Sequence, residues 1–212
     1  EIMSILERKG LLDNTTIVIF GDHGDDYWTH GFKGGMVHAT EPYTQITWTP
    51  LAIRDPSLTP ANSANLASTI DIAPTCLALL GIDEPGGFRH DGLNLLTQRQ
   101  EIVFSQNFTA NQPDKRHIGL AKAFAATDDT YVLLASSRGL EMYAWRLDLG
   151  NHRNLLQFFD LGQDGELTLR ELPDAAAHFK SALAHNPRAV ASIADRFRVL
   201  RDALSARIAA KR

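Results

Sequence analysis

The 212 residues of this chain have the composition of an ordinary globular protein: 44% are hydrophobic and 22% are charged. These values exclude an intrinsically disordered chain, and the net charge of -4 gives no reason to expect a nucleic acid or an anionic membrane as partner. No stretch approaches the roughly 18 consecutive apolar residues of a membrane span, so we expect none, and the cellular compartment stays open. The single cysteine, Cys76, excludes an intramolecular disulfide, and its apolar, helix-like surroundings predict a core residue.

The first hundred residues alternate between helical and extended segments. In chain order, the pattern predicts a helix over residues 1–10, a buried strand that ends at Asp22, a strand over 49–54 and a helix over 72–80. A loop rich in Gly and His separates the two strands. We assign residues 1–100 to one α/β core domain.

After residue 100 the pattern changes to short extended runs separated by turn-forming residues. These runs cover residues 102–108, 121–127, 130–135 and 140–147. Because hairpin-like turns separate the later runs, we expect a small antiparallel sheet, and we assign residues 101–158 to this subdomain.

The last part of the chain, residues 159–212, combines an Asp/Gly-rich loop with a long amphipathic helix. Apolar residues recur every three or four positions, which places them on one stripe of a helix that packs against the body of the protein. The residues of this stripe are Val190, Ile193, Phe197, Leu200, Leu204 and Ile208.

A carboxylate and an imidazole follow the first predicted strand directly, at Asp22 and His23. Together they suit zinc, manganese or another borderline divalent ion, whereas a set of carboxylates alone indicates calcium or magnesium. Ligands in open α/β sheets bind outside the carboxyl ends of strands, which favours a metal site here. The competing interpretation is an Asp that caps a turn beside a structural His. Nearby candidates for further ligands are Asp25, Asp26, His30 and His38.

The order of sequence blocks around this pair resembles the sulfatase family of the alkaline phosphatase superfamily. The blocks are GLLDNTTIVIFGDHG, THG, VHATEPY, TPLAIRDP, STIDIAPTCLALLGI and DGLNLL, with LEMYAWRLDLGNHRNLL further along. The resemblance covers residues 1–156 and fits the C-terminal half of such an enzyme. It implies part of an alkaline-phosphatase-like α/β sandwich, to which the small antiparallel sheet and the long terminal helix are added.

The resemblance also implies roles for individual residues. Asp22 and His23 match the family's ligands of a catalytic divalent ion, here calcium, manganese or zinc. His38 matches a His that contacts the sulfate or phosphate and assists the leaving group. His30 and Lys33 are candidates for substrate binding; for His30 a loop-stabilising role is an equal alternative, and the spacing of Lys33 differs from the family pattern.

The family's nucleophile is absent from this chain. Sulfatases use a formylglycine made in a Cys/Ser-x-Pro-x-Arg motif of their N-terminal half, and no such motif occurs here. We therefore expect a fragment of a sulfate ester hydrolase, acting on a small anionic ester, that is inactive alone. A phosphodiesterase, phosphonate hydrolase or phosphoethanolamine transferase of the same superfamily is the alternative. A parallel strand left exposed at Asp22 would favour a homo-oligomer.

Residues Asp160 to Glu171 match much of an EF-hand calcium loop. Asp160, Asp164, Gly165 and Glu171 occupy loop positions 1, 5, 6 and 12, but Gly162 replaces the oxygen ligand at position 3. A non-catalytic calcium-binding module is therefore an alternative hypothesis for this chain. We favour a simple Asp-Gly turn between two structured pieces.

Overall fold

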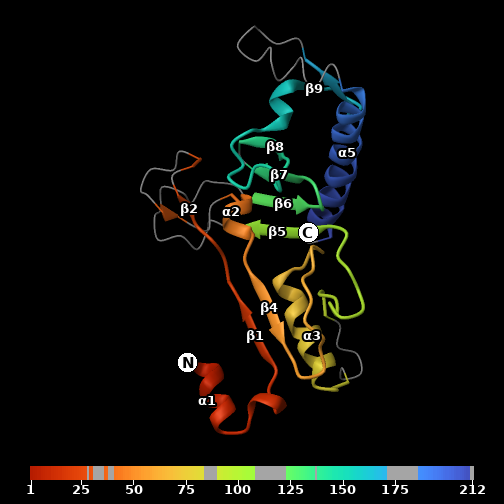
Figure 1. Ribbon diagram of the computed structural model, residues 1–212. Helices are drawn as coiled ribbons and strands as arrows, with labels where there is room; N and C mark the ends of the chain where they lie inside the picture. The colour runs from red at the N-terminus through yellow and green to blue at the C-terminus, as the bar shows by residue number, and fades with distance from the viewer. Residues whose placement is uncertain are drawn as a thin grey trace. The chain divides into compact units, whose positions relative to one another are not determined.

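The computed structural model describes residues 1–27, 29–30, 36–37, 41–83, 90–107, 123–136, 138–170 and 186–210, with the backbone alone for 36–37. The chain forms two compact units, each drawn in Figure 1 and described here by itself. The first consists of Glu1–Gly24 and Trp48–Glu101, and the second of Asp25–Thr47 and Ile102–Arg212. No helix in the described ranges is long and apolar enough to cross a bilayer.

The first unit begins with helix α1 (Ile2–Arg8) and a 3-10 turn, η1 (Leu12–Asn14), and its strands are β1 (Ile17–Phe20) and β4 (Leu51–Arg54). The two strands pair antiparallel in a two-stranded sheet, from Ile17 opposite Arg54 to Phe20 opposite Leu51. The predicted strand is therefore present, but its partner is not parallel.

The prediction that this strand is buried is wrong, because its first half is only partly buried and its second half is exposed. Ile19 is 65% exposed and Phe20 is 48% exposed. The physical reason is the small size of the sheet: within the described residues β1 has one neighbouring strand, which satisfies one edge and leaves apolar side chains uncovered.

Helix α3 (Ile72–Leu79) follows a 3-10 turn, η2 (Thr69–Asp71), and its start is fixed by Asp71. The fully buried Asp71 carboxylate accepts hydrogen bonds from the backbone N–H of Ser68 (2.7 Å) and Leu93 (2.8 Å) and from the amide of Gln100 (2.8 Å). One carboxylate thus connects the helix start to the segment around residues 93–100. Cys76 lies in α3 and is only partly buried, which corrects its assignment to the core.

The second unit is built on a four-stranded antiparallel sheet, as predicted. Its order is β5 (Val103–Asn107), β6 (Ala123–Thr127), β7 (Val132–Ser136) and β8 (Gly139–Tyr143). The inward-facing residues of β7, among them Leu133, form the main hydrophobic core together with the terminal helix.

Helix α5 (Pro187–Ala209) covers this sheet, as Figure 1 shows, and confirms the predicted terminal helix. Four residues of the predicted stripe are buried: Ile193, Phe197, Leu200 and Leu204. Arg196 also binds the buried carboxylate of Asp128, which follows β6, at 2.7 Å. The helix is therefore attached by apolar packing and by one partly buried ion pair.

Residues 159–169 form a β-hairpin of β9 (Phe159–Leu161) and β10 (Leu167–Leu169), preceded by the 3-10 turn η5 (Leu155–Phe158). Gly165 adopts a φ of 82° in the turn, a conformation that favours glycine. Asp160 lies in β9, and its carboxylate accepts a hydrogen bond from Arg170 at 2.8 Å. The hairpin agrees with the predicted Asp-Gly turn, because an EF-hand loop would be flanked by helices and this turn is flanked by strands. Glu171 lies outside the described residues.

Candidate functional site

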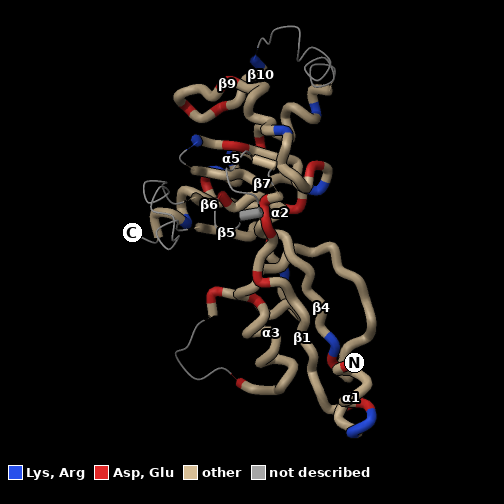
Figure 2. The backbone as a smooth tube through the Cα atoms, turned by 90° about the vertical axis from the view of Figure 1, so that its left-hand side faces the viewer, with Lys and Arg blue, Asp and Glu red and all other residues tan. Residues whose placement is uncertain are grey.

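Charge alone does not locate a site, because acidic and basic residues are distributed along both units (Figure 2). The local geometry at the end of β1 is more informative. The backbone N–H of Gly21 donates to the carbonyl of Pro50 at 3.1 Å, which continues the pairing with β4 past Phe20. A Cβ on Gly21 would lie 3.0 Å from the Cβ of Thr49, so the close approach of the two segments favours glycine. Asp22 and His23 follow this fixed strand end.

The side chains of Asp22 and His23 face each other. Nε2 of His23 lies 3.6 Å from Oδ2 of Asp22, and the backbone N–H of His23 donates to Oδ1 of Asp22 at 2.9 Å. Nδ1 of His23 lies 2.8 Å from the carbonyl of Gly24. If Nδ1 carries the proton and donates to that carbonyl, Nε2 presents its lone pair on the side of the carboxylate.

This donor set fits a divalent cation. Metal–ligand bonds of about 2.0–2.2 Å allow one ion to contact two atoms at the observed spacing, and a backbone carbonyl is a common partner for the second nitrogen of a ligating His. The side chains are also accessible, with relative exposures of 84% for Asp22 and 42% for His23. Across the described ranges, no group of three or more His, Cys, Asp or Glu side chains is arranged to hold a metal ion. Alone, the pair could supply two ligands of a coordination shell.

The other predicted site residues fall in the second unit or outside the described residues. Asp26 and His30 belong to the second unit. Lys33 and His38 lie outside the described residues, so their predicted roles stay predictions. The last described residue before His38 is Val37, in strand β3 (Met36–Val37), which pairs antiparallel with β2 (Asp26–Tyr27).

Asp26 and His30 form a second aspartate–histidine pair, which is buried. Oδ1 of the fully buried Asp26 accepts hydrogen bonds from the backbone N–H of Thr29 (3.0 Å) and from the Gln45 amide (2.7 Å). Oδ2 lies 3.3 Å from Nδ1 of His30, whose side chain is only 7% exposed. The imidazole stacks on the ring of Tyr43 with centroids 3.5 Å apart and planes inclined by 3°. Such burial agrees with the loop-stabilising alternative for His30.

Tyr43 continues this cluster into the four-stranded sheet. Its hydroxyl donates to Oε2 of Glu141 at 3.0 Å, and the hydroxyl of Tyr143 donates to Oε1 of the same carboxylate at 2.9 Å. Burial raises the pKa of both tyrosines above the usual value, and the charge of Glu141 raises each pKa further. Both phenols therefore remain protonated donors at physiological pH.

Asn151 is a buried residue of this cluster that the sequence analysis did not single out. It is buried and adopts a φ of 50°, a left-handed conformation that asparagine tolerates better than most residues. Its Oδ1 accepts a hydrogen bond from the backbone N–H of Thr44 at 2.5 Å, and its backbone carbonyl lies 3.2 Å from Nε2 of His30. An Asn after Gly150 indicates a turn but does not indicate these distant partners.

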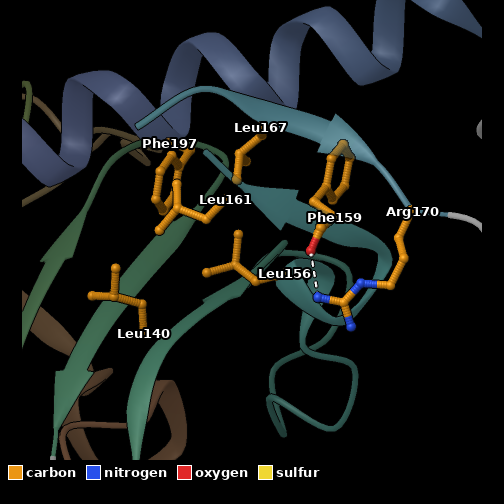
Figure 3. A pocket seen from close by; sticks show the side chains of 7 residues that line it. All are labelled: Leu140, Leu156, Phe159, Leu161, Leu167, Arg170 and Phe197. Carbon is orange, nitrogen blue, oxygen red and sulfur yellow. Dashed lines mark hydrogen bonds between the residues drawn. The ribbon is translucent and has the colours of Figure 1, made fainter. Parts of the chain in front are cut away.

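A cavity of about 280 Å³ lies in the second unit, between the β9–β10 hairpin, β8 and α5 (Figure 3). Its lining is apolar apart from one guanidinium and consists of Leu140, Leu156, Phe159, Leu161, Leu167, Arg170 and Phe197. Arg170 donates to the carbonyl of Phe159 at 3.0 Å and also binds Asp160. Because the lining contains no carboxylate, imidazole or thiol, we do not assign hydrolytic chemistry to this cavity.

Comparison with known proteins shows a similarity to one family. Residues 1–82, which include the Asp22–His23 pair, match the family described as Sulfatase. This part of the chain is similar to the sulfatase family. Arylsulfatase K of Danio rerio is 27% identical to this chain over a 201-residue alignment, which covers 88% of the chain and 36% of the relative. The chain thus spans about a third of the length of that relative.

Solved structures agree on the fold. A structure in complex with its substrate, D-glucosamine-2-N,6-O-disulfate, matches with a TM-score of 0.56 and 18% identity, covering 93% of this chain and 37% of its own. The phosphonate monoester hydrolase of Silicibacter pomeroyi matches with a TM-score of 0.54 and 19% identity, covering 82% of this chain and 42% of its own. The predicted alkaline-phosphatase-like α/β fold, with a small antiparallel sheet and a long C-terminal helix, is confirmed.

Proposed function

We propose that the full-length protein is a metal-dependent hydrolase that cleaves sulfate esters of small anionic substrates. The observation that carries this proposal is the accessible Asp22–His23 pair, with Nε2 and Oδ2 3.6 Å apart at the end of β1. The similarity of residues 1–82 to the sulfatase family supports it, since these residues contain the pair.

In this proposal Asp22 and His23 hold a divalent cation: calcium, manganese or zinc. When bound, such an ion neutralises negative charge on the ester and polarises its oxygens. The carbonyl of Gly24 orients the His23 ring so that Nε2 faces the site. His38 is the proposed proton donor to the leaving oxygen, and Lys33 is the proposed cation for the substrate anion.

The nucleophile belongs to another part of the protein. The printed sequence contains no Cys/Ser-x-Pro-x-Arg motif, so the 212 residues supply ligands and a proton donor but no group to attack sulfur. We therefore propose that the chain alone does not turn over substrate.

The structural neighbours guide the choice of substrate. One was solved with D-glucosamine-2-N,6-O-disulfate as its substrate. We propose a sulfated sugar as the first substrate class to test, because its ester carries the anion that the site is expected to bind.

Phosphonate monoester hydrolysis is the second candidate. Imidazole beside a carboxylate favours manganese or zinc over calcium, and phosphonate monoester hydrolases are among the structural neighbours. Both candidates use the same Asp22–His23 pair and differ in the nucleophile and in the transferred group.

Hydrolysis assays on the full-length protein test both candidates. Sulfated glucosamine, an aryl sulfate and a phosphonate monoester are offered with calcium, manganese or zinc, after removal of bound metal by a chelator. Release of sulfate that depends on added metal supports the first candidate, and preferential hydrolysis of the phosphonate supports the second. If no ester is cleaved under any condition, the proposed function is wrong.

A further inference from the structure

We propose that His30 is a buried imidazolium whose second proton makes a set of packing contacts sensitive to pH. These contacts join His30 to Asp26, Tyr43 and Asn151, and we call them the His30 clamp. All four residues belong to the second unit, so the inference uses contacts within one compact body. It goes beyond the proposed function, because it involves neither the metal nor the ester.

Both nitrogens of the His30 ring face oxygen atoms. Oδ2 of Asp26 lies 3.3 Å from Nδ1, and the backbone carbonyl of Asn151 lies 3.2 Å from Nε2. A neutral imidazole carries one N–H, whereas an imidazolium presents an N–H at both nitrogens. Because the His30 side chain is only 7% exposed, water has little access to a nitrogen whose lone pair faces an oxygen. The positions of the two oxygens therefore favour the doubly protonated ring.

The carboxyl group of Asp26 is arranged as an anion. It is fully buried, and its Oδ1 accepts hydrogen bonds from the backbone N–H of Thr29 (3.0 Å) and from the Gln45 amide (2.7 Å). Two donors on one oxygen favour the ionised form. Among the described residues, Oδ2 of Asp26 and Nδ1 of His30 have no hydrogen-bond partner, so their ion pair at 3.3 Å is the contact that compensates for the buried charge.

The third contact of the clamp also favours a cation. The His30 ring is stacked on the phenol ring of Tyr43, with centroids 3.5 Å apart and planes inclined by 3°. The face of an aromatic ring is electronegative and attracts a cation, most strongly where water is excluded. Tyr43 is 0% exposed, so the imidazolium lies against a dry aromatic face.

The charged groups around the two stacked rings are mostly acidic. The titratable and charged groups described there are Asp26, Glu41, Tyr43, Arg138, Glu141 and Tyr143. The buried carboxylate of Glu41 lies 3.5 Å from Nε of Arg138, and Glu141 accepts both phenol protons. Three carboxylates thus stand against one guanidinium in the described part of the cluster. A positive charge on His30 reduces this excess of negative charge.

The turn that carries Asn151 adds a pair of opposite charges when its histidine is protonated. Asp148 and His152 lie 3.1 Å apart, and Asp148 also accepts the backbone N–H of His152 (3.0 Å) and Arg153 (2.8 Å). The backbone N–H of Asn151 donates to the carbonyl of Asp148 at 2.9 Å, which fixes the carbonyl that faces His30.

A buried imidazolium makes stability fall as the pH rises. An unfolded chain releases a histidine proton at about pH 6.5, whereas the clamp holds this proton to a higher pH. Above about pH 6.5 the folded state therefore binds one proton more than the unfolded state, and the equilibrium constant for unfolding rises with pH by up to about tenfold per unit. At lower pH both states bind the proton, and the stabilisation is complete.

Two substitutions and a matched control test the clamp. His30→Gln removes the titrating ring, and Asp26→Asn keeps an acceptor at Oδ1 while it removes the charge opposite Nδ1. His152→Gln is the control, because His152 also faces an aspartate four positions earlier, Asp148, but its side chain is 67% exposed.

The first readout is the charge of the His30 ring in the full-length protein. Two-bond proton–nitrogen correlation spectra of protein with 15N-labelled histidine distinguish an imidazolium from either neutral tautomer. Nuclear Overhauser contacts with the Tyr43 ring identify the resonance without a variant. At neutral pH we expect protons on both nitrogens in the wild type and a neutral ring in Asp26→Asn.

The second readout is the equilibrium constant for urea unfolding between about pH 6.5 and 8. The wild-type constant should rise with pH more steeply than that of His30→Gln, by up to about tenfold per pH unit, because one proton is linked to unfolding. His152→Gln should keep most of the wild-type slope.

The proposal is overturned if the wild-type His30 ring is neutral at neutral pH, including the case in which the proton resides on Asp26. Equal slopes in the wild type and His30→Gln would also overturn it, as would a ring that stays doubly protonated in Asp26→Asn. If a variant does not fold, the wild-type spectrum alone decides. No activity is measured, so a failure of the proposed function leaves this test unaffected.

Discussion

Two aspartate–histidine pairs lie between residues 22 and 30, and they differ in almost everything except composition. Asp22 and His23 are accessible, with side-chain exposures of 84% and 42%, and they make hydrogen bonds within residues 22–24. Asp26 and His30 are 0% and 7% exposed and bond to residues as distant as Asn151. An incoming ion can reach the accessible pair, whereas the fold encloses the buried pair. Residue type alone therefore does not assign the role; burial does.

The strongest test of this contrast is Asp22→Ala. Removal of an accessible carboxylate should change the free energy of unfolding by less than about 0.5 kcal/mol. Loss of the ligand should abolish stoichiometric metal and lower kcat/KM on the order of a thousandfold. Elemental analysis, ester hydrolysis and urea unfolding of the full-length protein measure the three effects.

Asp13→Ala is the control for Asp22→Ala, because Asp13 is a fully exposed acidic residue of the same unit that is no candidate for the metal. An Asp22→Ala protein that keeps its metal and its activity would show that the accessible pair is not a ligand pair.

The buried pair should respond in the opposite way. Asp26→Ala leaves the Gln45 amide and the Thr29 N–H without their acceptor, so the free energy of unfolding should fall by about 3 kcal/mol while metal content stays unchanged. Asp129→Ala removes an exposed carboxylate, 78% accessible, from an ion pair with Arg146 in the same unit and should cost less than about 1 kcal/mol. Equal stability losses in the two variants would contradict the assignment of Asp26 as a buried anchor.

The buried cluster also predicts a dependence of stability on alkaline pH. The raised pKa of Tyr143 means that the unfolded chain loses this proton first, so stability should fall as the pH rises above about 10. Tyr143→Phe should reduce that slope by up to about 1.4 kcal/mol per pH unit. Urea unfolding between pH 8 and 11 gives the slopes, with Tyr27→Phe as the control for an exposed phenol. A slope unchanged by Tyr143→Phe would argue against the raised pKa.

The smallest effect is expected at the hairpin that resembles a calcium loop. Asp160→Ala removes a partly exposed ion pair with Arg170 and should alter stability by less than about 1 kcal/mol. Calcium binding, measured by titration calorimetry, should be the same in this variant as in the wild type. Loss of a calcium site on this substitution would favour the non-catalytic calcium-binding module.

The sequence predicts the terminal helix and the antiparallel sheet because their signals are local. The stripe from Val190 to Ile208 repeats with the helical period, and the buried residues of α5, such as Phe197, lie on it. The burial of Ile19 and Phe20 was predicted wrongly, since an apolar run shows what a strand prefers and not which elements cover it.

At the candidate site, too, the sequence predicts contacts between neighbouring residues but not contacts between distant ones. Asp22 and His23 are adjacent in sequence, so their pairing follows from the motif itself. The bond between Asn151 and Thr44 joins residues 107 positions apart, and only the folded chain brings them together. No short-range pattern contains that information.

The stacking of His30 on Tyr43 has a spectroscopic consequence. With 3.5 Å between centroids and nearly parallel planes, the imidazole protons lie in the shielding region of the phenol ring. Their proton resonances should therefore shift upfield from those of an exposed imidazole. These resonances therefore report, without any label, whether His30 remains stacked on Tyr43.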